Sequence, residues 1–334
     1  RSEFELAESL RPKGLSDFAD IEELRQHLMG ALKEAGRLAR RRTVSDFSRK
    51  QFEHAPLSRI GHGSLGGKGR GIAFLNSILA DLEPTDFSGL QVRVPKTVII
   101  CTDFFDRFLD DNRLRDYAFS ATDDRELAAR FMAARTPGRL RGDLEFVARS
   151  IDGPLAVRSS SMLEDSLHQP FAGIYNTLMI GNRSPDPVER VRELTTAVKR
   201  VYASTFFSNA RAYLETTGSR PEEEKMAVVI QQLVGRQRQG RFYPSFSGVG
   251  QSYNFYPIGP QRSADGIVHL VLGLGRMVVD GGTALRFSPR HPEVLPQIAT
   301  TKNLMDATQR EFFALDLDRA CGSKEDEFYS TVRR

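Results

Sequence analysis

The sequence predicts an α+β fold, because strand-like and helix-like segments follow one another without the strict alternation of a parallel α/β sheet. Three segments rich in β-branched residues, 92–101, 225–235 and 266–275, predict buried strands. Two stretches with apolar residues at helical spacing, 16–54 and 187–214, predict helices. With 334 residues the chain is long enough for about two domains, each with its own core.

The composition excludes several classes of protein. Hydrophobic residues make up 40% and charged residues 27% of the chain, which excludes a disordered or fibrous protein. Two cysteines, Cys101 and Cys321, cannot form a disulfide framework, and no apolar run approaches the roughly 18–20 residues that span a bilayer. We therefore expect a cytoplasmic protein without a membrane partner. The first residues, RSEF, are neither an initiator methionine nor a signal peptide, so we expect a piece of a longer polypeptide.

Residues 1–56 predict a helical arm or linker. Ser16 or Asp17 can cap its helix, while Gly30 and Gly36 leave open a break between two helices. A basic run follows, made of Arg37, Arg40, Arg41, Arg42, Arg49 and Lys50. Such a run is typical of a solvated helix face. The alternative, recruitment of nucleic acid, lacks a recognisable motif, and the net charge of +4 is small. We therefore expect no nucleic acid partner.

The body begins near Leu57. We expect a helix at 72–79 and then the strand 92–101, in which Pro95 fits a strand start or a sheet edge. Asp103 can cap the helix that follows. Residues 155–160 predict a short strand that leads into a polar loop.

The second half predicts one long helix over 187–214, ended by Gly218 and Pro221. The strands 225–235 and 266–275 come next, with a polar, basic loop at 236–243 between them. Residues 290–334 begin with several prolines and predict a helical extension around 304–315.

The first chemical signal is segment 61–71, with six glycines in eleven residues. Clustered glycines let backbone N–H groups approach phosphate oxygens, and Lys68 can reach the same anion. The Walker spacing fails, because His62 and Gly69 stand where glycine and Ser/Thr are needed. The bare G-x-G-x-x-G spelling of dinucleotide and protein-kinase loops is present, but 55–60 predicts only a poor strand and neither HRD nor DFG occurs. The alternative is a flexible turn.

The second signal is segment 155–166, LAVRSSSMLEDS. A strand that ends in Arg158 and three hydroxyl groups can present a forked cation and hydroxyl donors to a polyphosphate. The acidic pair Glu164 and Asp165 can orient that arginine or hold a metal. The alternative is a surface loop with an arginine–carboxylate ion pair.

Several motifs in order resemble one family. They are LGGKG at 65–69, VPKT at 94–97, AVRSS at 156–160 with FAG at 171–173, VIQQLV at 229–234, and GLGRMVVDG at 273–281. Together they resemble the N-terminal ATP-binding region of phosphoenolpyruvate synthase and pyruvate phosphate dikinase. The resemblance runs from about 57 to 289 and implies a two-lobed ATP-grasp nucleotide-binding fold, with the first lobe at 57–220 and the second at 221–289. Outside it, the residues themselves predict an N-terminal helical extension and a C-terminal helical extension at 290–334.

The resemblance also implies a site for ATP and Mg²⁺. Lys68 and Arg158 match the family residues on the phosphates, where both would act in catalysis. The other residues that it assigns to the nucleotide are Gly66, Gly67, Ser159, Ser160, Gly173, Gln231, Leu233, Val234 and Arg276. Of these, residues 231–234 match the hinge whose backbone holds adenine.

Two departures from the family pattern stand out. Where the family carries a metal-binding glutamate after Gly275, this chain has Arg276, and a cation cannot ligate Mg²⁺. Asp280 is then the candidate metal ligand. None of the six histidines lies in the family's phosphohistidine motif. The resemblance therefore implies that the phosphohistidine domain and the phosphoenolpyruvate/pyruvate barrel lie elsewhere in the native chain.

Two functions remain open at this stage. The first is an ATP-dependent phosphotransferase, kinase-like or dikinase-like, that passes a phosphoryl group to a histidine on a separate domain and is incomplete without it. The second is a non-catalytic ATP-sensing module that has lost a metal ligand, which Arg276 motivates.

Overall fold

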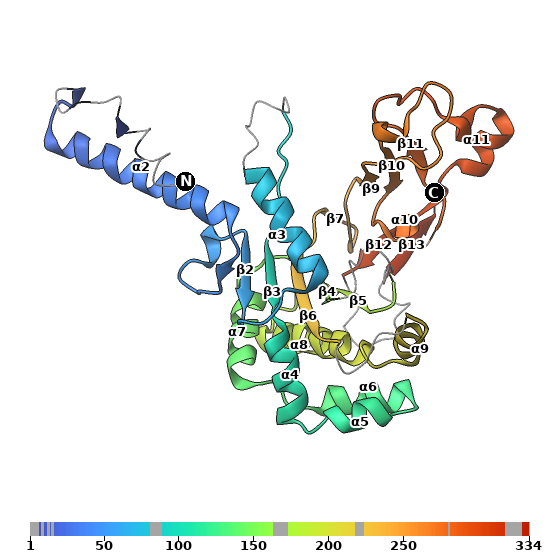
Figure 1. Cartoon of the computed structure of the whole chain (residues 1–334), viewed down its shortest axis with the longest axis horizontal. Coiled ribbons are helices and arrows are strands. Elements are labelled where there is room, and N and C mark those ends of the chain that lie inside the picture. Colours follow the sequence, from blue (N-terminus) through green and yellow to red (C-terminus); the bar gives the residue numbers. More distant parts are fainter. Residues whose placement is uncertain are drawn as a thin grey trace. The chain divides into compact units, whose positions relative to one another are not determined.

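The computed structural model describes residues 17–80, 89–162, 173–217, 224–279, 281–317 and 329–333, with residues 7, 10, 11 and 14 before them. The chain divides into two compact units, which we describe separately. Unit 1 comprises Arg1–Ile151, Ala156–Leu178 and Leu194–Gln232, and unit 2 comprises Asp152–Leu155, Met179–Glu193 and Leu233–Arg334. Helices and strands mix in irregular order, which confirms the α+β class (Figure 1).

A six-stranded sheet forms the centre of unit 1, in the order β1-β2-β3-β6-β4-β5. Its strands are β1 (Ser45–Asp46), β2 (Leu57–Ile60), β3 (Thr97–Ile100), β4 (Leu155–Ser161), β5 (Thr177–Ile180) and β6 (Met226–Gln232). β3 runs parallel to β2 and antiparallel to β6. Buried β-branched runs predicted β3 and β6 correctly, and the short strand predicted at 155–160 is β4. β2 was dismissed as a poor strand, and this is wrong, because Leu57 and Ile60 are buried on either side of two polar residues.

Several helices accompany this sheet along the chain. They are α2 (Ile21–Arg42), α3 (Gly66–Ala80), α4 (Thr102–Asp111), α5 (Arg115–Ser120), α6 (Asp124–Ala133), α7 (Gly138–Ser150), α8 (Pro187–Ser204) and α9 (Ser208–Thr217). α3 lies along β2, β3 and β6, where Leu57, Ile99 and Val229 pack with its Ile72 and Ala73 (Figure 1). Strand alternation sends the other buried side chains of β3 and β6 to the opposite face.

That opposite face is lined by an aromatic cluster. The ring of Phe105, from α4, lies 5.1 Å from Tyr202 and 6.0 Å from Phe206, centroid to centroid. Phe108 and Phe131 extend the cluster to α6. Rings at these spacings gain from edge-to-face and offset contacts beyond their buried area. The cluster thus fixes α4 against the sheet.

Helix ends in unit 1 differ from the sequence prediction in two places. α2 runs unbroken through Gly30 and Gly36, and its N-cap is Asp20, whose side chain accepts from the Glu23 amide. The single helix expected over 187–214 is two helices, because Phe206 turns into the aromatic cluster. α9 then restarts at Ser208, capped by Asp124 of α6 through bonds of 2.9 and 2.7 Å.

Unit 2 contains two antiparallel sheets, ordered β11-β10-β9 and β13-β12-β8-β7. The strands are β7 (Arg236–Arg238), β8 (Arg241–Tyr243), β9 (Phe246–Gln251), β10 (Ile267–Leu272), β11 (Leu285–Phe287), β12 (Glu311–Asp316) and β13 (Tyr329–Arg333). The helices are α10 (Arg276–Val279) and α11 (Thr301–Ala307). β10 confirms the strand predicted at 266–275.

Two predictions in unit 2 are wrong. Residues 236–243 are a β-hairpin instead of a loop, because Gln239 and Gly240 both have positive φ and form the turn of β7 and β8. The helix expected to reach Leu315 ends at Ala307, and β12 follows. The Gln309 side chain bonds both the N–H and the C=O of Leu272 in β10, which ends the helix and aligns the new strand.

The domain boundaries predicted at 56, 220 and 289 stay predictions. Within the described residues, β6 belongs to the sheet of unit 1, and the division between the units falls between Gln232 and Leu233. No helix in the described part of the chain has both the length and the apolar character needed to cross a membrane.

Candidate functional site

The glycine-rich segment connects strand β2 to helix α3. The segment turns at Gly61, where φ is +98°, and the helix begins at Gly66, where φ is +69°. The sequence predicted this helix only from residue 72. It starts six residues earlier, so Lys68 lies in its first turn. The Gly66 amide bonds the Ser64 hydroxyl at 3.2 Å, and the positive end of the helix dipole favours an anion at this turn.

The start of α3 presses against β4. A Cβ on Gly66 would lie 1.7 Å from the carbonyl oxygen of Ser160, so no other residue fits there without moving the backbone. The buried Ser160 hydroxyl accepts from the Gly69 amide at 2.9 Å and donates to the Leu65 carbonyl at 2.8 Å. Ser160 therefore holds the first turn of α3 in place.

Lys68 reaches the same strand. Its Nζ donates to the Oγ of Ser159 at 3.2 Å, and the side chain is half-buried. Gly66, Gly67, Lys68, Ser159 and Ser160, predicted from separate motifs, are thus brought together. A cation, buried hydroxyl groups and a helix N-terminus at one point form an arrangement that suits a phosphate group.

The remaining predicted residues of this motif lie in β4 and after it. Arg158 is half-buried, and by strand alternation it lies on the same face of β4 as Ser160 and on the opposite face from Ser159. Gly173, with φ of +80°, lies in the turn before β5, and a Cβ there would meet open space. Glu164 and Asp165, together with residues 171 and 172 of the FAG motif, lie outside the described residues.

The predicted adenine hinge spans the end of β6. The Gln231 side chain donates to Thr97 Oγ1 at 3.0 Å, and the Gln232 amide bonds the Lys96 carbonyl at 2.9 Å. The Leu233 amide bonds the Pro154 carbonyl at 2.9 Å, while the Val234 side chain is exposed. The amides of 232 and 233 are therefore committed to the protein itself. The hinge is also where the chain passes from unit 1 to unit 2.

Lys96 supports this hinge from the side of β3. Its ammonium donates to the carbonyls of Phe52 and Ala55 and lies 4.1 Å from the centre of the Phe52 ring. Burial lowers the pKa of Lys96 to about 8. The Lys96 ammonium is therefore bonded to protein groups, and we assign it a structural role.

Arg276 begins the short helix α10 in unit 2. Its guanidinium carbon lies 5.3 Å from the centre of the Phe313 ring, a cation–π contact. Asp280, the candidate metal ligand, lies outside the described residues. Within the part of the chain that the structure describes, no group of three or more His, Cys, Asp or Glu side chains is placed to hold a metal.

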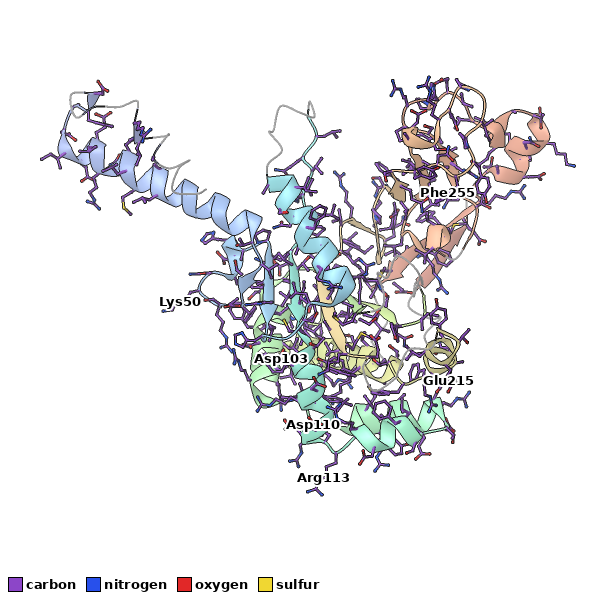
Figure 2. All side chains as sticks on the ribbon, viewed as in Figure 1. Lys50, Asp103, Asp110, Arg113, Glu215 and Phe255 are labelled. Atoms are coloured by element: carbon purple, nitrogen blue, oxygen red, sulfur yellow. The ribbon has the colours of Figure 1, made fainter. Side chains whose placement is uncertain are left out.

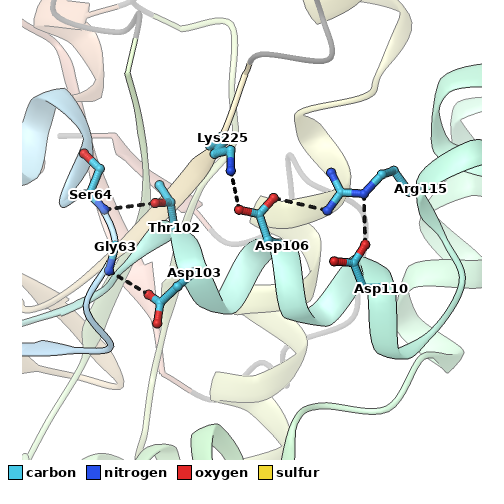
Figure 3. A network of polar contacts seen from close by, with 8 residues as sticks. All are labelled: Gly63, Ser64, Thr102, Asp103, Asp106, Asp110, Arg115 and Lys225. Carbon is cyan, nitrogen blue, oxygen red and sulfur yellow. Dashed lines mark hydrogen bonds and ion pairs between the residues drawn. The ribbon is translucent and has the colours of Figure 1, made fainter.

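Sequence reasoning missed two residues that contact the glycine-rich segment. Asp103 was expected to cap α4, but the N-cap is Cys101, without a side-chain bond, and Asp103 lies inside the helix. Its carboxylate instead accepts from the amides of His62 and Gly63, and Thr102 Oγ1 accepts from the Ser64 amide (Figure 3). A Thr-Asp pair directly after a buried strand was the available signal.

Cys101 lies beside these groups and is a buried free thiol. Burial, together with the neighbouring Asp103 carboxylate, raises its pKa to about 11. A thiol with so high a pKa is not a nucleophile at neutral pH. Cys101 therefore belongs to the packing beneath the site.

Comparison with known proteins identifies the family of this chain. The family model described as "Pyruvate phosphate dikinase, AMP/ATP-binding domain" matches residues 62–316. The chain is similar to a probable phosphoenolpyruvate synthase of Archaeoglobus fulgidus, 29% identical over 127 residues that cover 38% of this chain and 14% of that protein. It is also similar to a rifampicin phosphotransferase of Streptomyces sviceus, 28% identical over 268 residues that cover 75% of this chain and 27% of that protein.

The matched region includes the whole glycine-rich turn from His62, the β4 motif, the hinge and α10. The alignments span well under a third of either relative's length. The chain belongs to the AMP/ATP-binding domain family of pyruvate phosphate dikinase, whose fold is of the ATP-grasp type.

Proposed function

We propose that this chain is the nucleotide-binding part of a phosphotransferase similar to phosphoenolpyruvate synthase and pyruvate phosphate dikinase. It binds ATP, and a phosphoryl group then passes to a histidine on a separate domain of the native polypeptide. The observation that carries the proposal is Lys68, which lies in the first turn of α3 with its Nζ 3.2 Å from the Ser159 hydroxyl of β4. Family membership supports the choice of ATP as ligand.

In this proposal the protein acts by positioning and by electrostatics. The first turn of α3, which includes the Gly67 amide, offers the positive end of the helix dipole to the phosphates. Lys68 adds a positive charge, and its attraction to the transferred group becomes stronger as negative charge develops on that group. Arg158 is proposed as a second phosphate ligand, and residues 231–234 as the segment that borders adenine.

Magnesium enters the proposal as part of the nucleotide complex. Bound together with ATP, it would neutralise part of the phosphate charge. Asp280 is the candidate protein ligand, and its surroundings lie outside the described residues. The steps assigned to the protein are therefore those of Lys68, Arg158 and the α3 amides alone.

Calorimetric titration with Mg·ATP tests the site. Lys68→Ala and Arg158→Ala should each weaken binding by on the order of tenfold or more, the cost of a charged hydrogen bond. Lys50→Ala is the matched control, because Lys50 is an exposed lysine of the same unit, and it should bind as the parent does (Figure 2). Parent-like binding by both site variants would show that the site assignment is wrong.

A second function is favoured by one observation, the arginine at position 276 where the family has a metal-binding glutamate. It is a non-catalytic module that senses ATP and sets the position of partner domains. ATP labelled at the β- or γ-phosphate, incubated with Mg²⁺ and the full native polypeptide, separates the two functions. Label on a histidine, or conversion of ATP to AMP, excludes the sensor, whereas ATP that is bound and returned intact supports it.

A further inference from the structure

The first half of the glycine-rich segment is held by two consecutive side chains of α4. Asp103 Oδ2 accepts from the His62 amide at 3.2 Å and Oδ1 from the Gly63 amide at 3.1 Å. Thr102 Oγ1 accepts from the Ser64 amide at 2.9 Å. Figure 3 shows the bonds to Gly63 and Ser64. Three successive amides, the groups that glycine-rich turns offer to phosphates, are thus already bonded to the protein.

Thr102 and Asp103 lie so close to the glycines in this half that no side chain fits at those positions. A Cβ on Gly61 would lie 2.4 Å from an Asp103 carboxylate oxygen, and a Cβ on Gly63 would lie 2.6 Å from the Asp103 amide nitrogen and from Thr102 Oγ1. Both distances are too short for any real Cβ. The absence of a side chain at Gly61 and Gly63 therefore allows α4 to approach the segment closely. The absence of a side chain at Gly66 allows the same close approach of β4.

α4 is itself firmly fixed, so it can set the position of the segment. Phe104, Phe105 and Phe108 are buried beneath it. Farther along the helix, the Asp106 carboxylate bonds Lys225 at 2.5 Å, immediately before the hinge strand β6 (Figure 3). One helix therefore contacts the glycine-rich segment at its first turn and the start of β6 one turn later.

The charge of Asp103 decides what kind of role it has. A carboxylate repels a polyphosphate, so Asp103 cannot serve as a phosphate ligand. It can accept two backbone N–H bonds, and such charge-assisted bonds are stronger than neutral ones. We propose that Thr102 and Asp103 are positioning residues, which hold the amides of His62, Gly63 and Ser64 so that the first turn of α3 and Lys68 are preset for the nucleotide.

This inference rests on the proposed function for its effect on ATP, and two pairs of variants test it. Asp103→Ala removes both acceptors, and Asp103→Asn keeps one. Thr102→Val removes the acceptor with little change of shape, and Thr102→Ser restores it. Asp110→Ala is the control, because Asp110 lies at the other end of α4 and pairs with Arg115 (Figure 2).

Two measurements are made on each variant. In Mg·ATP titrations Asp103→Ala should bind on the order of tenfold more weakly, Asp103→Asn less so, and Thr102→Val a few-fold more weakly, whereas Thr102→Ser and Asp110→Ala should match the parent. In hydrogen exchange without nucleotide, the amides of 62–64 should exchange faster in Asp103→Ala, while those of β3 stay protected.

The outcomes separate the two proposals. Unchanged exchange at 62–64 and parent-like ATP binding in both Asp103→Ala and Thr102→Val would overturn the positioning role. Loss of β3 protection in both variants, without recovery in Thr102→Ser, would also overturn it, since the pair would then serve general stability. If the parent fails to bind ATP, the proposed function fails, and the exchange at 62–64 still decides whether Thr102 and Asp103 hold the segment.

Discussion

Two helix starts, one in each unit, are built in the same way and carry different chemistry. α3 begins at Gly66 and α10 begins three residues after Gly273, and both glycines have positive φ and face a strand carbonyl that a Cβ would strike. In unit 1 the cation of the helix start, Lys68, lies beside a buried hydroxyl. In unit 2 the cation, Arg276, lies over the Phe313 ring. In both units a glycine allows the backbone turn. The residues around the cation that follows it, Lys68 or Arg276, determine what the turn can bind.

The largest expected effect comes from replacing the two glycines. Gly66→Ala places a Cβ 1.7 Å from a backbone oxygen and should cost more than about 3 kcal/mol of unfolding free energy and abolish ATP binding. Gly273→Ala should cost less, because its Cβ would lie 2.5 Å from the Phe312 side chain and 2.7 Å from the Phe313 carbonyl oxygen, a smaller overlap than at Gly66. Urea denaturation measures both. Gly153→Ala is the control, since its φ is also positive but the space around it is open. Equal costs at 66 and 153 would contradict the close approach to β4.

The next effect compares two cations that lie over aromatic rings. Lys96→Met in unit 1 leaves the carbonyls of Phe52 and Ala55 without their donor and should cost about 1–3 kcal/mol. Arg276→Met in unit 2 gives up a longer contact, 5.3 Å against 4.1 Å, and should cost less than about 1 kcal/mol. Chemical denaturation of the two variants checks the order. If Arg276→Met lost more unfolding free energy than Lys96→Met, the cation in unit 2 would contribute more to stability than the cation in unit 1, contrary to this prediction.

Arg276→Glu tests the difference in chemistry directly. The new carboxylate supplies the metal ligand that the family pattern has at this position, so Mg²⁺ should strengthen ATP binding by on the order of tenfold more in the variant than in the parent. Titrations with and without Mg²⁺ measure this ratio. Arg276→Gln removes the cation without adding a carboxylate and serves as control. The same ratio in both variants would mean that position 276 lies away from the metal.

The smallest effect is a pH dependence confined to unit 2. Burial, and then the charge of Arg286 on the paired strand, lowers the pKa of His269 from its ordinary value of 6.5. As the pH falls through that value, the unfolded chain binds a proton that the folded chain does not, so the free energy of unfolding decreases. Solvent screens the partly exposed ring, which keeps the change under about 1 kcal/mol. His269→Gln should remove this part of the acid sensitivity, and an unchanged pH profile would refute it.

Sequence reasoning succeeded where a strand has a strong apolar run. β3, β6 and β10 were predicted because continuous β-branched runs need little context, and β4 was predicted from its apolar start at 155–157. β2 and the β7–β8 hairpin were missed because their residues are largely polar, and they form strands through their partners and, in the hairpin, through a turn at Gln239 and Gly240. For such segments tertiary pairing outweighs local propensity.

In the candidate site, too, the residues that local motifs indicate were predicted, and those that depend on tertiary contacts were not. Lys68 and the hydroxyls of β4 were proposed from motifs, and the structure brings them together. Asp103 was assigned to the wrong task, because an acidic residue near a helix start is normally a cap, and only the fold shows which amides lie opposite it. Arg158 and the hinge residues stay predictions until binding is measured.

The place of β6 in the sheet has a consequence for how the chain is made. β3 pairs with β6 across a separation of 134 residues, between Thr97 and Gln231, and α3 packs on both strands. At roughly 5–20 residues per second, a ribosome exposes β3 for several seconds or more before its partner emerges. During that interval an apolar strand edge is unpaired, the state in which nascent chains aggregate or recruit chaperones. Fragments that end before Met226 should remain in this state.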